Sequence, residues 1–324
     1  MFSLSREGEG GAPAPGAGAS PDREHSTTSK PRNVRLHINY ALAKDVNQGD
    51  QMDEQSEKGR VFKALHERNR AFIIPNPWDI GTARLLAHLG FEALATTSAG
   101  YAFSVGQRDN TIGRERMLSH VSAIVSATDL PVSADLENGF GDDPETVAET
   151  IRLAAETGLV GGSVEDSTGQ PTAPIYPHAQ AVERIAAAAE VVRGLSFSFV
   201  LTARAENYLV GKPDLNDTIQ RLQAYQEAGA DVLYAPGLAN RADIAAVVSS
   251  VDRPVNVLVG SAAVQLALDE LSSMGVRRVS VGSGLTRVAL GAFLRAAKEM
   301  HEHGTFTFVE EAVSFRELSE MFDA

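Results

Sequence analysis

The sequence predicts an α/β protein built as one (β/α)8 TIM barrel of parallel strands. From about residue 71, short β-rich runs recur roughly every 25–35 residues and alternate with helical stretches rich in Ala, Leu and Glu. Each run is almost continuously apolar, as expected of a parallel strand that is covered on both faces. Eight such units indicate a closed barrel, and a doubly wound open sheet is the alternative.

The eight predicted strands follow one another along the chain. They are AFIIPN (71–76), EALATT (92–97), PVSADLE (131–137), GGSVED (161–166), FVLTARAE (199–206), DVLYAP (231–236), PVNVLVG (254–260) and RVSVGS (278–283). Several helical stretches end in a glycine just before a strand, as in AHLGFEAL and QEAGADVLY, which is a common helix stop. After the last strand, LTRVALGAFLRAAKEMHEHGTF predicts a long helix and VEEAVSFRELSEMFDA a terminal one.

The first part of the chain differs from the rest. Residues 1–56 include a long Gly/Pro/Ala/Ser-rich stretch without an apolar period, which predicts a disordered low-complexity extension. The barrel and its C-terminal helices are expected over residues 57–324, with an amphipathic opening helix that begins near Met52. The extension is either a native tail or an over-extended gene model.

Composition excludes several classes of function. The 324 residues contain no cysteine, so thiolate nucleophiles, Cys-ligated metals and disulfides are excluded. The net charge of −13 and the lack of a basic stripe argue against nucleic acid as a partner. No run of 18 apolar residues suggests a membrane span, and the N-terminus lacks the features of a signal or transit peptide, so we expect a cytoplasmic protein.

Three acids end two neighbouring predicted strands. In a TIM barrel these ends face the active site. Asp135 and Glu137 are two residues apart, and alternate strand residues point the same way, so both are expected to enter the barrel mouth beside Glu165. Converging carboxylates repel one another unless a cation lies between them, and oxygen ligands suit Mg²⁺ or Mn²⁺. The competing interpretation is a structural network in which these acids pair with an arginine.

The fifth strand carries that arginine. Arg204 lies among apolar residues, and its planar fork suits a substrate carboxylate or phosphonate, although a salt bridge to Glu206 or Glu165 is the alternative. Small residues after the second strand, in TTSAGY, predict a loop whose backbone N–H groups hold an oxyanion.

The motifs resemble the isocitrate lyase/phosphoenolpyruvate mutase superfamily from about residue 60 to 300. SADLENGFG is similar to the DADTGYG-type signature of that family, and IPNPWDIGTARLLAHLGFEALATTSAG resembles its opening strand, helix and loop. GQRD, SVEDS and LTARAE match the acidic residue after the loop and the ends of the fourth and fifth strands.

The resemblance implies roles for these residues. Asp135 would be the direct metal ligand, with Glu137 and Glu165 acting through metal-bound waters. Members of the family cleave or form C–C or P–C bonds through a Mg²⁺-bound enolate, and they form dimers or tetramers that exchange the last barrel helix, here residues 286–302. The other implied site residues are Ser98, Asp109 and Arg204 as catalytic groups, with Ser98, Ala99, Gly100, Arg204, Glu206 and Asn256 as substrate-binding groups.

The sequence departs from the best-known members after the fourth strand. The KRCGH-like segment of the lyases is replaced by STGQPTAPIYPHAQAV, and LYAPGL stands where those lyases carry a glutamate. The lysine and asparagine of phosphoenolpyruvate mutase are also missing from this segment. Tyr176 or His178 is therefore considered as a replacement acid, although a surface residue without a role is the favoured interpretation of His178.

These observations lead to a ranked prediction of function. We expect an enzyme that cleaves a C–C bond of a small 2-oxo or 2-hydroxy di- or tricarboxylic acid through an enolate. A phosphonomutase or phosphonate hydrolase that acts on a P–C bond is the first alternative. A catalytically impaired barrel that only binds a metabolite is the second.

Overall fold

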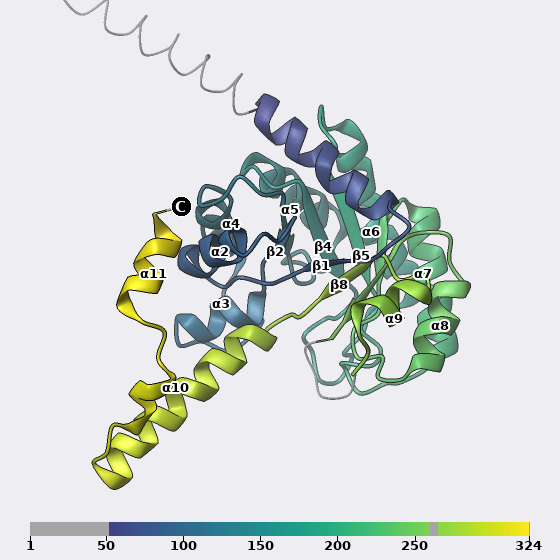
Figure 1. Cartoon of the computed structure of the whole chain (residues 1–324). Coiled ribbons are helices and arrows are strands. Elements are labelled where there is room, and N and C mark those ends of the chain that lie inside the picture. The colour runs from purple at the N-terminus through teal and green to yellow at the C-terminus, as the bar shows by residue number, and fades with distance from the viewer. Residues whose placement is uncertain (1–51, 260–264, 324) are drawn as a thin grey trace, which may run out of the picture. The chain divides into compact units, whose positions relative to one another are not determined.

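The computed structural model describes residues 52–259 and 265–323, and the barrel predicted from the sequence is present in them (Figure 1). All eight predicted strands form, each shorter than its apolar run. They are β1 (Phe72–Ile74), β2 (Leu94–Ala95), β3 (Val132–Asp135), β4 (Gly161–Glu165), β5 (Val200–Arg204), β6 (Val232–Tyr234), β7 (Val255–Leu258) and β8 (Arg278–Ser280). Gly260, the last residue of the seventh predicted run, lies outside the described residues.

The sheet is parallel and nearly closed. Its order is β1-β8-β7-β6-β5-β4-β3-β2, so the strands from β2 to β8 pair with their sequence neighbours, β1 pairs with β8, and β1 and β2 form the two edges. This order is that of a barrel and not of a doubly wound sheet. Between β2 and β1, the Ala95 N–H donates to Pro75 O at 3.1 Å and the Asn76 side chain donates to Thr96 O at 3.1 Å, which joins the two remaining edges.

Helices alternate with the strands. They are α2 (Ile80–His88), α3 (Ser98–Ser104), α4 (Arg114–Val125), α5 (Pro144–Glu156), α6 (His178–Gly194), α7 (Leu215–Ala228), α8 (Arg241–Ser249), α9 (Leu268–Ser273), α10 (Gly284–His303), the 3-10 helix η1 (Thr307–Glu311) and α11 (Phe315–Phe322). The predicted glycine stops are confirmed, for example by Gly229, which ends α7 in the left-handed region at φ 111°. None of these helices is long and apolar enough to cross a membrane in the part of the chain that the structure describes.

A helix over residues 52–67 precedes the barrel, as predicted. Its Phe62 and Leu65 are fully buried against the first residues of several strands, including Phe72 and Val200. The helix therefore covers the N-terminal end of the barrel and leaves the opposite end open. Residues 52–56, which the prediction assigned to the extension, are helical, and because residues 1–51 lie outside the described residues, the rest of the disordered extension remains a prediction.

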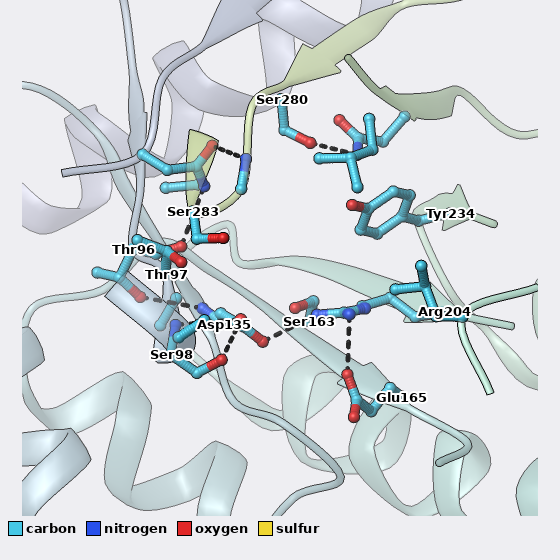
Figure 2. Close-up of a pocket in the computed structure, with 18 of the residues that line it drawn as sticks. Thr96, Thr97, Ser98, Asp135, Ser163, Glu165, Arg204, Tyr234, Ser280 and Ser283 are labelled. Carbon is cyan, nitrogen blue, oxygen red and sulfur yellow. Dashed lines mark hydrogen bonds and ion pairs between the residues drawn. The ribbon is translucent and has the colours of Figure 1, made fainter. Parts of the chain in front are cut away.

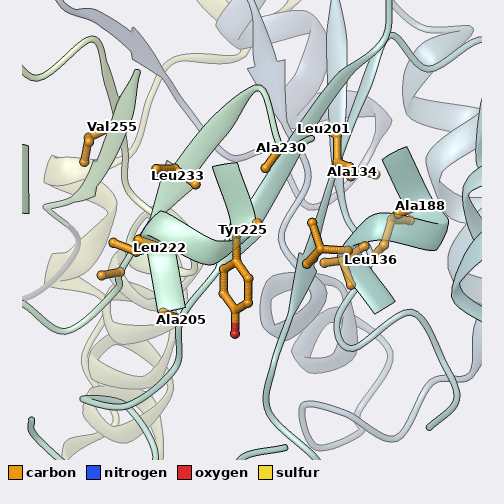
Figure 3. Close-up of a cluster of buried hydrophobic side chains, with 14 of the residues drawn as sticks. Ala134, Leu136, Ala188, Leu201, Ala205, Leu222, Tyr225, Ala230, Leu233 and Val255 are labelled. Atoms are coloured by element: carbon orange, nitrogen blue, oxygen red, sulfur yellow. The ribbon is translucent and has the colours of Figure 1, made fainter. Parts of the chain in front are cut away.

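The main core lies between the strands and the outer helices. Figure 3 shows Tyr225 and Leu222 of α7 beside Leu201 and Leu233 of the sheet, and all four side chains are fully buried. This layer fixes the strands around the barrel, so the residues at their carboxyl ends take defined positions.

The last helices are less well covered. Figure 1 shows α10 extending away from the barrel, and Thr286 is its one buried residue. Val288 and Phe293 are 71% and 65% exposed. Further along, α11 returns to α2, where the Arg84 guanidinium lies 5.6 Å from the centroid of the Phe322 ring.

Candidate active site

A cavity of about 380 Å³ opens at the carboxyl ends of the strands (Figure 2). Its walls include eight of the predicted site residues, contributed by five strands and the segments that follow them. These are Ser98, Ala99, Asp109, Asp135, Glu165, Arg204, Glu206 and Asn256. The volume suits a small ligand, and the lining is unusually polar for such a site.

Arg204, the last residue of β5, joins three acids. Its Nη1 contacts Asp135 Oδ1, its Nη2 contacts Glu165 Oε2 and its Nε contacts Glu206 Oε1, each at 2.9 Å. The register that pairs Glu165 with Arg204 across β4 and β5 places the two side chains on one level of the barrel. All three guanidinium nitrogens are therefore occupied by carboxylates, as the competing structural interpretation of Arg204 required.

Burial sets the electrostatics of this group. It raises the pKa of Glu165 well above its ordinary value and also raises that of Glu206, while the Arg204 charge opposes both shifts. Two buried acids beside one another would otherwise take up protons. Arg204 therefore favours charged carboxylates at the barrel mouth, and the Tyr234 ring, 5.2 Å from its guanidinium carbon, covers it.

Asp135 is held from two sides. One oxygen contacts Arg204, and the other accepts hydrogen bonds from the Ser98 N–H at 3.2 Å and the Ser98 hydroxyl at 2.8 Å. The Asp135 N–H donates to the Thr96 hydroxyl at 3.1 Å. The carboxylate of Asp135 is thus the most firmly oriented acid on the cavity wall.

The predicted oxyanion loop forms the first turn of a helix. Thr97 caps α3, and the Gly100 N–H donates to its hydroxyl at 3.2 Å. Because Ser98 N–H is bound to Asp135 and Gly100 does not line the cavity, two of the three predicted amide donors are occupied elsewhere. Ala99 is the predicted amide position that lines the cavity without a hydrogen bond from its N–H to another described residue.

Glu137 does not occupy the position that alternate strand residues would take. β3 ends at Asp135, and Glu137 turns away in a left-handed conformation at φ 49°. The prediction that one strand presents both side chains is therefore wrong. Glu137 lines an adjacent depression with Asn110 and Asn138 and is not part of the main cavity wall.

Asp109, Asp135 and Glu137 nevertheless influence one another. Burial, together with the charges of Asp135 and Asp109, raises the pKa of Glu137 to about 8. Burial and Asp135 likewise raise the pKa of Asp109. Glu137 Oε1 is buried and has no hydrogen-bond partner within residues 52–259 and 265–323. A buried carboxylate oxygen without a partner beside two further acids is a fitting environment for a cation.

The donor set is one that suits Mg²⁺ or Mn²⁺ held largely by water. No group of three or more His, Cys, Asp or Glu side chains among the described residues is placed to hold a metal ion together. Mg²⁺ commonly keeps several waters and takes one or two carboxylates. Asp135, with Glu137 and Asp109 nearby, fits that mode, whereas Glu165 is turned to Arg204.

Two predicted acids lie outside the cavity. Tyr176 is buried, and its hydroxyl donates to Asp142 at 2.5 Å and accepts from Asn138 at 3.1 Å. His178 is exposed at the start of α6. Neither lines the cavity, so the proposal that either one replaces the missing loop acid is not supported.

Several lining residues were not found from the sequence. Tyr234, Ser280 and Arg278 line the cavity beside Asn256, whose amide donates to the Ser280 hydroxyl at 2.9 Å. Figure 2 shows the Tyr234 ring between Arg204 and Ser280. Tyr234, Ser280 and Arg278 could have been found from their positions in the sequence. Each points inward from β6 or β8, and counting alternate residues along those strands would have indicated this direction.

Comparison with known proteins shows which family the chain belongs to. The family profile described as phosphoenolpyruvate phosphomutase matches residues 62–301, which is most of the chain. The chain belongs to this family. A 2-methylisocitrate lyase of Escherichia coli (strain K12) is 28% identical over 228 residues, which cover 67% of this chain and 76% of the relative.

Solved structures agree with this assignment. A candidate lyase/mutase from Burkholderia cenocepacia J2315 is 62% identical with a TM-score of 0.82, covering 84% of this chain and 98% of that one. A candidate phosphonomutase from the same organism is 35% identical with a TM-score of 0.70, covering 76% and 99%. Phosphonopyruvate hydrolase, in a complex with oxalate and Mg²⁺, shares the fold at 24% identity and a TM-score of 0.73, covering 82% and 94%.

Replacing Arg204 tests the ion-pair group. Arg204→Met should lower the free energy of unfolding by about 3–5 kcal/mol, because Glu165 and Glu206 lose their buried counter-charge. Chemical denaturation monitored by circular dichroism measures the loss. The triple variant that adds Glu165→Gln and Glu206→Gln should recover most of it, since Asp135, which is partly exposed and still bound by Ser98, is then the one acid of the three without its ion pair. Unchanged stability in Arg204→Met would show that the ion pairs do not support the fold.

Proposed function

We propose that this chain is a Mg²⁺-dependent lyase that cleaves a C–C bond of a small 2-oxo or 2-hydroxy acid through an enolate. The observation that carries the proposal is the Asp135 carboxylate, fixed by Arg204 and Ser98 on the cavity wall beside the partnerless oxygen of Glu137. Family membership and the lyase among the relatives support the same chemistry. Mn²⁺ is the alternative cation.

When bound, the cation would supply positive charge to the oxygens of a 2-oxo acid and so stabilise an enolate. The residues of the chain determine where that happens. Asp135, with Glu137 and Asp109 through water, would hold the cation, and Ser98 keeps Asp135 oriented. Ala99 lies on the cavity wall, and its N–H would donate to a substrate carboxylate.

Arg204 has a different role from the one that the sequence suggested. With its three nitrogens on Asp135, Glu165 and Glu206, it is a positioning residue that aligns the acids and opposes the rise in pKa that burial causes in Glu165 and Glu206. Burial raises the pKa of Tyr234 to about 12, so its hydroxyl keeps its proton at neutral pH. That hydroxyl can donate a hydrogen bond to an oxygen on which negative charge develops.

Chemistry at a P–C bond is a second candidate. The specific observation in its favour is the 35% identity to a candidate phosphonomutase. The cavity offers two cationic side chains, Arg204 and Arg278, and Arg204 is already paired with acids. A phosphonate group, which carries more charge than a carboxylate, is therefore poorly matched at the mouth of the cavity.

The cation and the bond that is cleaved can be tested together. Asp135→Asn should lower Mg²⁺ affinity in calorimetry by at least about 100-fold. Mutation of a residue that only hydrogen-bonds to a metal ligand already lowers metal affinity by about 10–100-fold, and loss of the ligand itself should lower it more. Turnover of 2-oxo and 2-hydroxy acids should disappear with it, while Asp269→Asn, an exposed substitution on α9, should change neither. Unchanged Mg²⁺ affinity in Asp135→Asn would overturn the site. Phosphate release or P–C rearrangement of phosphonopyruvate, followed by phosphorus NMR, would replace the C–C assignment with the second candidate.

We further propose that α10 packs against a second copy of the chain, giving a homodimer or homotetramer. Its exposed apolar side chains include Val288, Phe293 and Leu294, at 71%, 65% and 54%. A helix with so much exposed apolar surface commonly marks an interface. The helix exchange implied by the family resemblance, over residues 286–302, would cover them.

Light scattering after size-exclusion chromatography tests the association. Phe293→Glu should shift the protein toward the monomer, because a charge would be buried at the interface. Leu89→Glu is the matched control, since Leu89 is 64% exposed at the end of α2 and outside α10. A monomeric wild type, or an equal effect of both variants, would contradict an interface on α10.

A further inference from the structure

The floor of the cavity is polar where barrels are usually apolar. Inward-facing residues of a TIM barrel form layers dominated by Val, Ile and Leu. Here the cavity is also lined by Ser133, Ser163, Asn256 and Arg278, which come from β3, β4, β7 and β8. Asn256 and Arg278 are register partners on adjacent strands. The cavity therefore continues into the barrel, and a guanidinium borders its lower part.

Arg278 is a buried cation without an acidic partner. Only 5% of the residue is exposed. Its Nε donates to Asn256 Oδ1 at 3.0 Å and its Nη2 to the Thr202 hydroxyl at 3.0 Å. No Asp or Glu of the described residues lies within ion-pair distance of it. Burial accordingly lowers the pKa of Arg278 to about 10.

The remaining neighbour is a neutral histidine. Arg278 Nη1 lies 3.4 Å from His66 Nε2. Nδ1 of His66 is 2.8 Å from the Phe62 carbonyl, which can only accept, so Nδ1 carries the proton and Nε2 is an acceptor. Burial and the Arg278 charge lower the pKa of His66 to about 3, so it does not become a second cation at neutral pH.

The contrast with Arg204 indicates that Arg278 lacks an anionic partner. Both arginines line one cavity, but Arg204 is bound to three carboxylates and Arg278 to none. An isolated buried charge is costly unless an opposite charge and hydrogen bonds compensate it. A guanidinium has five N–H groups, and three contacts leave two for a ligand. An anion that enters the cavity would thus find its counter-charge at the floor, not at the mouth.

We propose that Arg278, with Asn256 and Ser280, is a specificity-determining anion site that binds the second carboxylate of the substrate, remote from its 2-oxo or 2-hydroxy end. This inference rests on the proposed function for the position of the other end, at Asp135 and Ala99. It identifies the feature that would distinguish a dicarboxylic from a monocarboxylic substrate in this chain. A purely structural Arg278, which only ties β8 to Thr202 of β5, would give no such discrimination.

The site is tested by measuring, with calorimetry on the Mg²⁺-loaded protein, the affinities of small organic acids. Each dicarboxylic acid is compared with a monocarboxylic acid of the same chain length. The pairs are 2-oxoglutarate with 2-oxovalerate, and malate with 2-hydroxybutyrate, and oxalate reports on the Asp135 end alone. The wild type should prefer the diacid of at least one pair by about 10-fold or more, as expected of a charge-assisted bidentate contact. Arg278→Met should abolish that preference and change oxalate and monoacid affinity less than about 3-fold.

The neighbouring arginine is the matched control. Arg277 precedes Arg278 on the chain and does not line the cavity, so Arg277→Met should keep the preference. Arg278→Lys should keep part of it, since a point charge replaces the fork. Equal loss for diacid, monoacid and oxalate in Arg278→Met would return the residue to a structural role.

A wild-type measurement decides the question even if Arg278→Met does not fold. The diacid should raise the unfolding temperature more than its monoacid partner, because it binds only the folded state more tightly. No difference in any pair would overturn the anion site. Failure of oxalate to bind the wild type would count against the proposed function, whereas a diacid preference lost in the Arg278 variants would still support the floor site.

Discussion

Arg204 lies where three strands of the barrel bring their acids together. The carboxylates of Asp135, Glu165 and Glu206 come from the ends of β3, β4 and β5, and burial raises the pKa of Glu165 and Glu206. One guanidinium, with a nitrogen on each, supplies the compensating charge. Because Asp135 is the acid best placed for a cation, the orientation of that candidate ligand depends on the same ion-pair group.

The two arginines of the cavity divide it into unlike regions. Around Arg204 the positive charge is already balanced, so the mouth favours a cation near Asp135 and Glu137. Around Arg278 the charge is unbalanced, and the floor favours an anion. Tyr234 lies between Arg204 and Ser280 (Figure 2), so a neutral hydroxyl-bearing side chain separates the two regions. A ligand with a metal-binding head and a carboxylate tail is complementary to this arrangement.

The barrel was predictable because its signals are local and repeated. Each strand is an apolar run, and glycines such as Gly229 end helices just before strands. The partners of side chains were harder to predict, because the same acids at the same strand ends suit either a metal or an arginine. Asp135 is shared between Arg204 and Ser98, and only coordinates show that sharing.

The remaining differences have specific causes. Glu137 was placed by strand alternation, but the strand ends two residues earlier and the chain reverses at a positive φ. Tyr176 was considered as an acid because it lies in the right segment, yet its hydroxyl is bound by Asp142 and Asn138. Arg278 was overlooked since the pair Arg277–Arg278 resembles a solvated strand start. Its inward direction follows from the position of Ser280 two residues later.

A crystal structure with Mg²⁺ and oxalate would test the central claim most directly, namely that Asp135 holds the cation while Arg204 stays with its acids. The expected result is an ion on Asp135, oxalate on that ion near the Ala99 N–H, and the contacts of Arg204 with Glu165 and Glu206 retained. An ion located away from Asp135, or oxalate bound by Arg204 with Glu165 displaced, would contradict it.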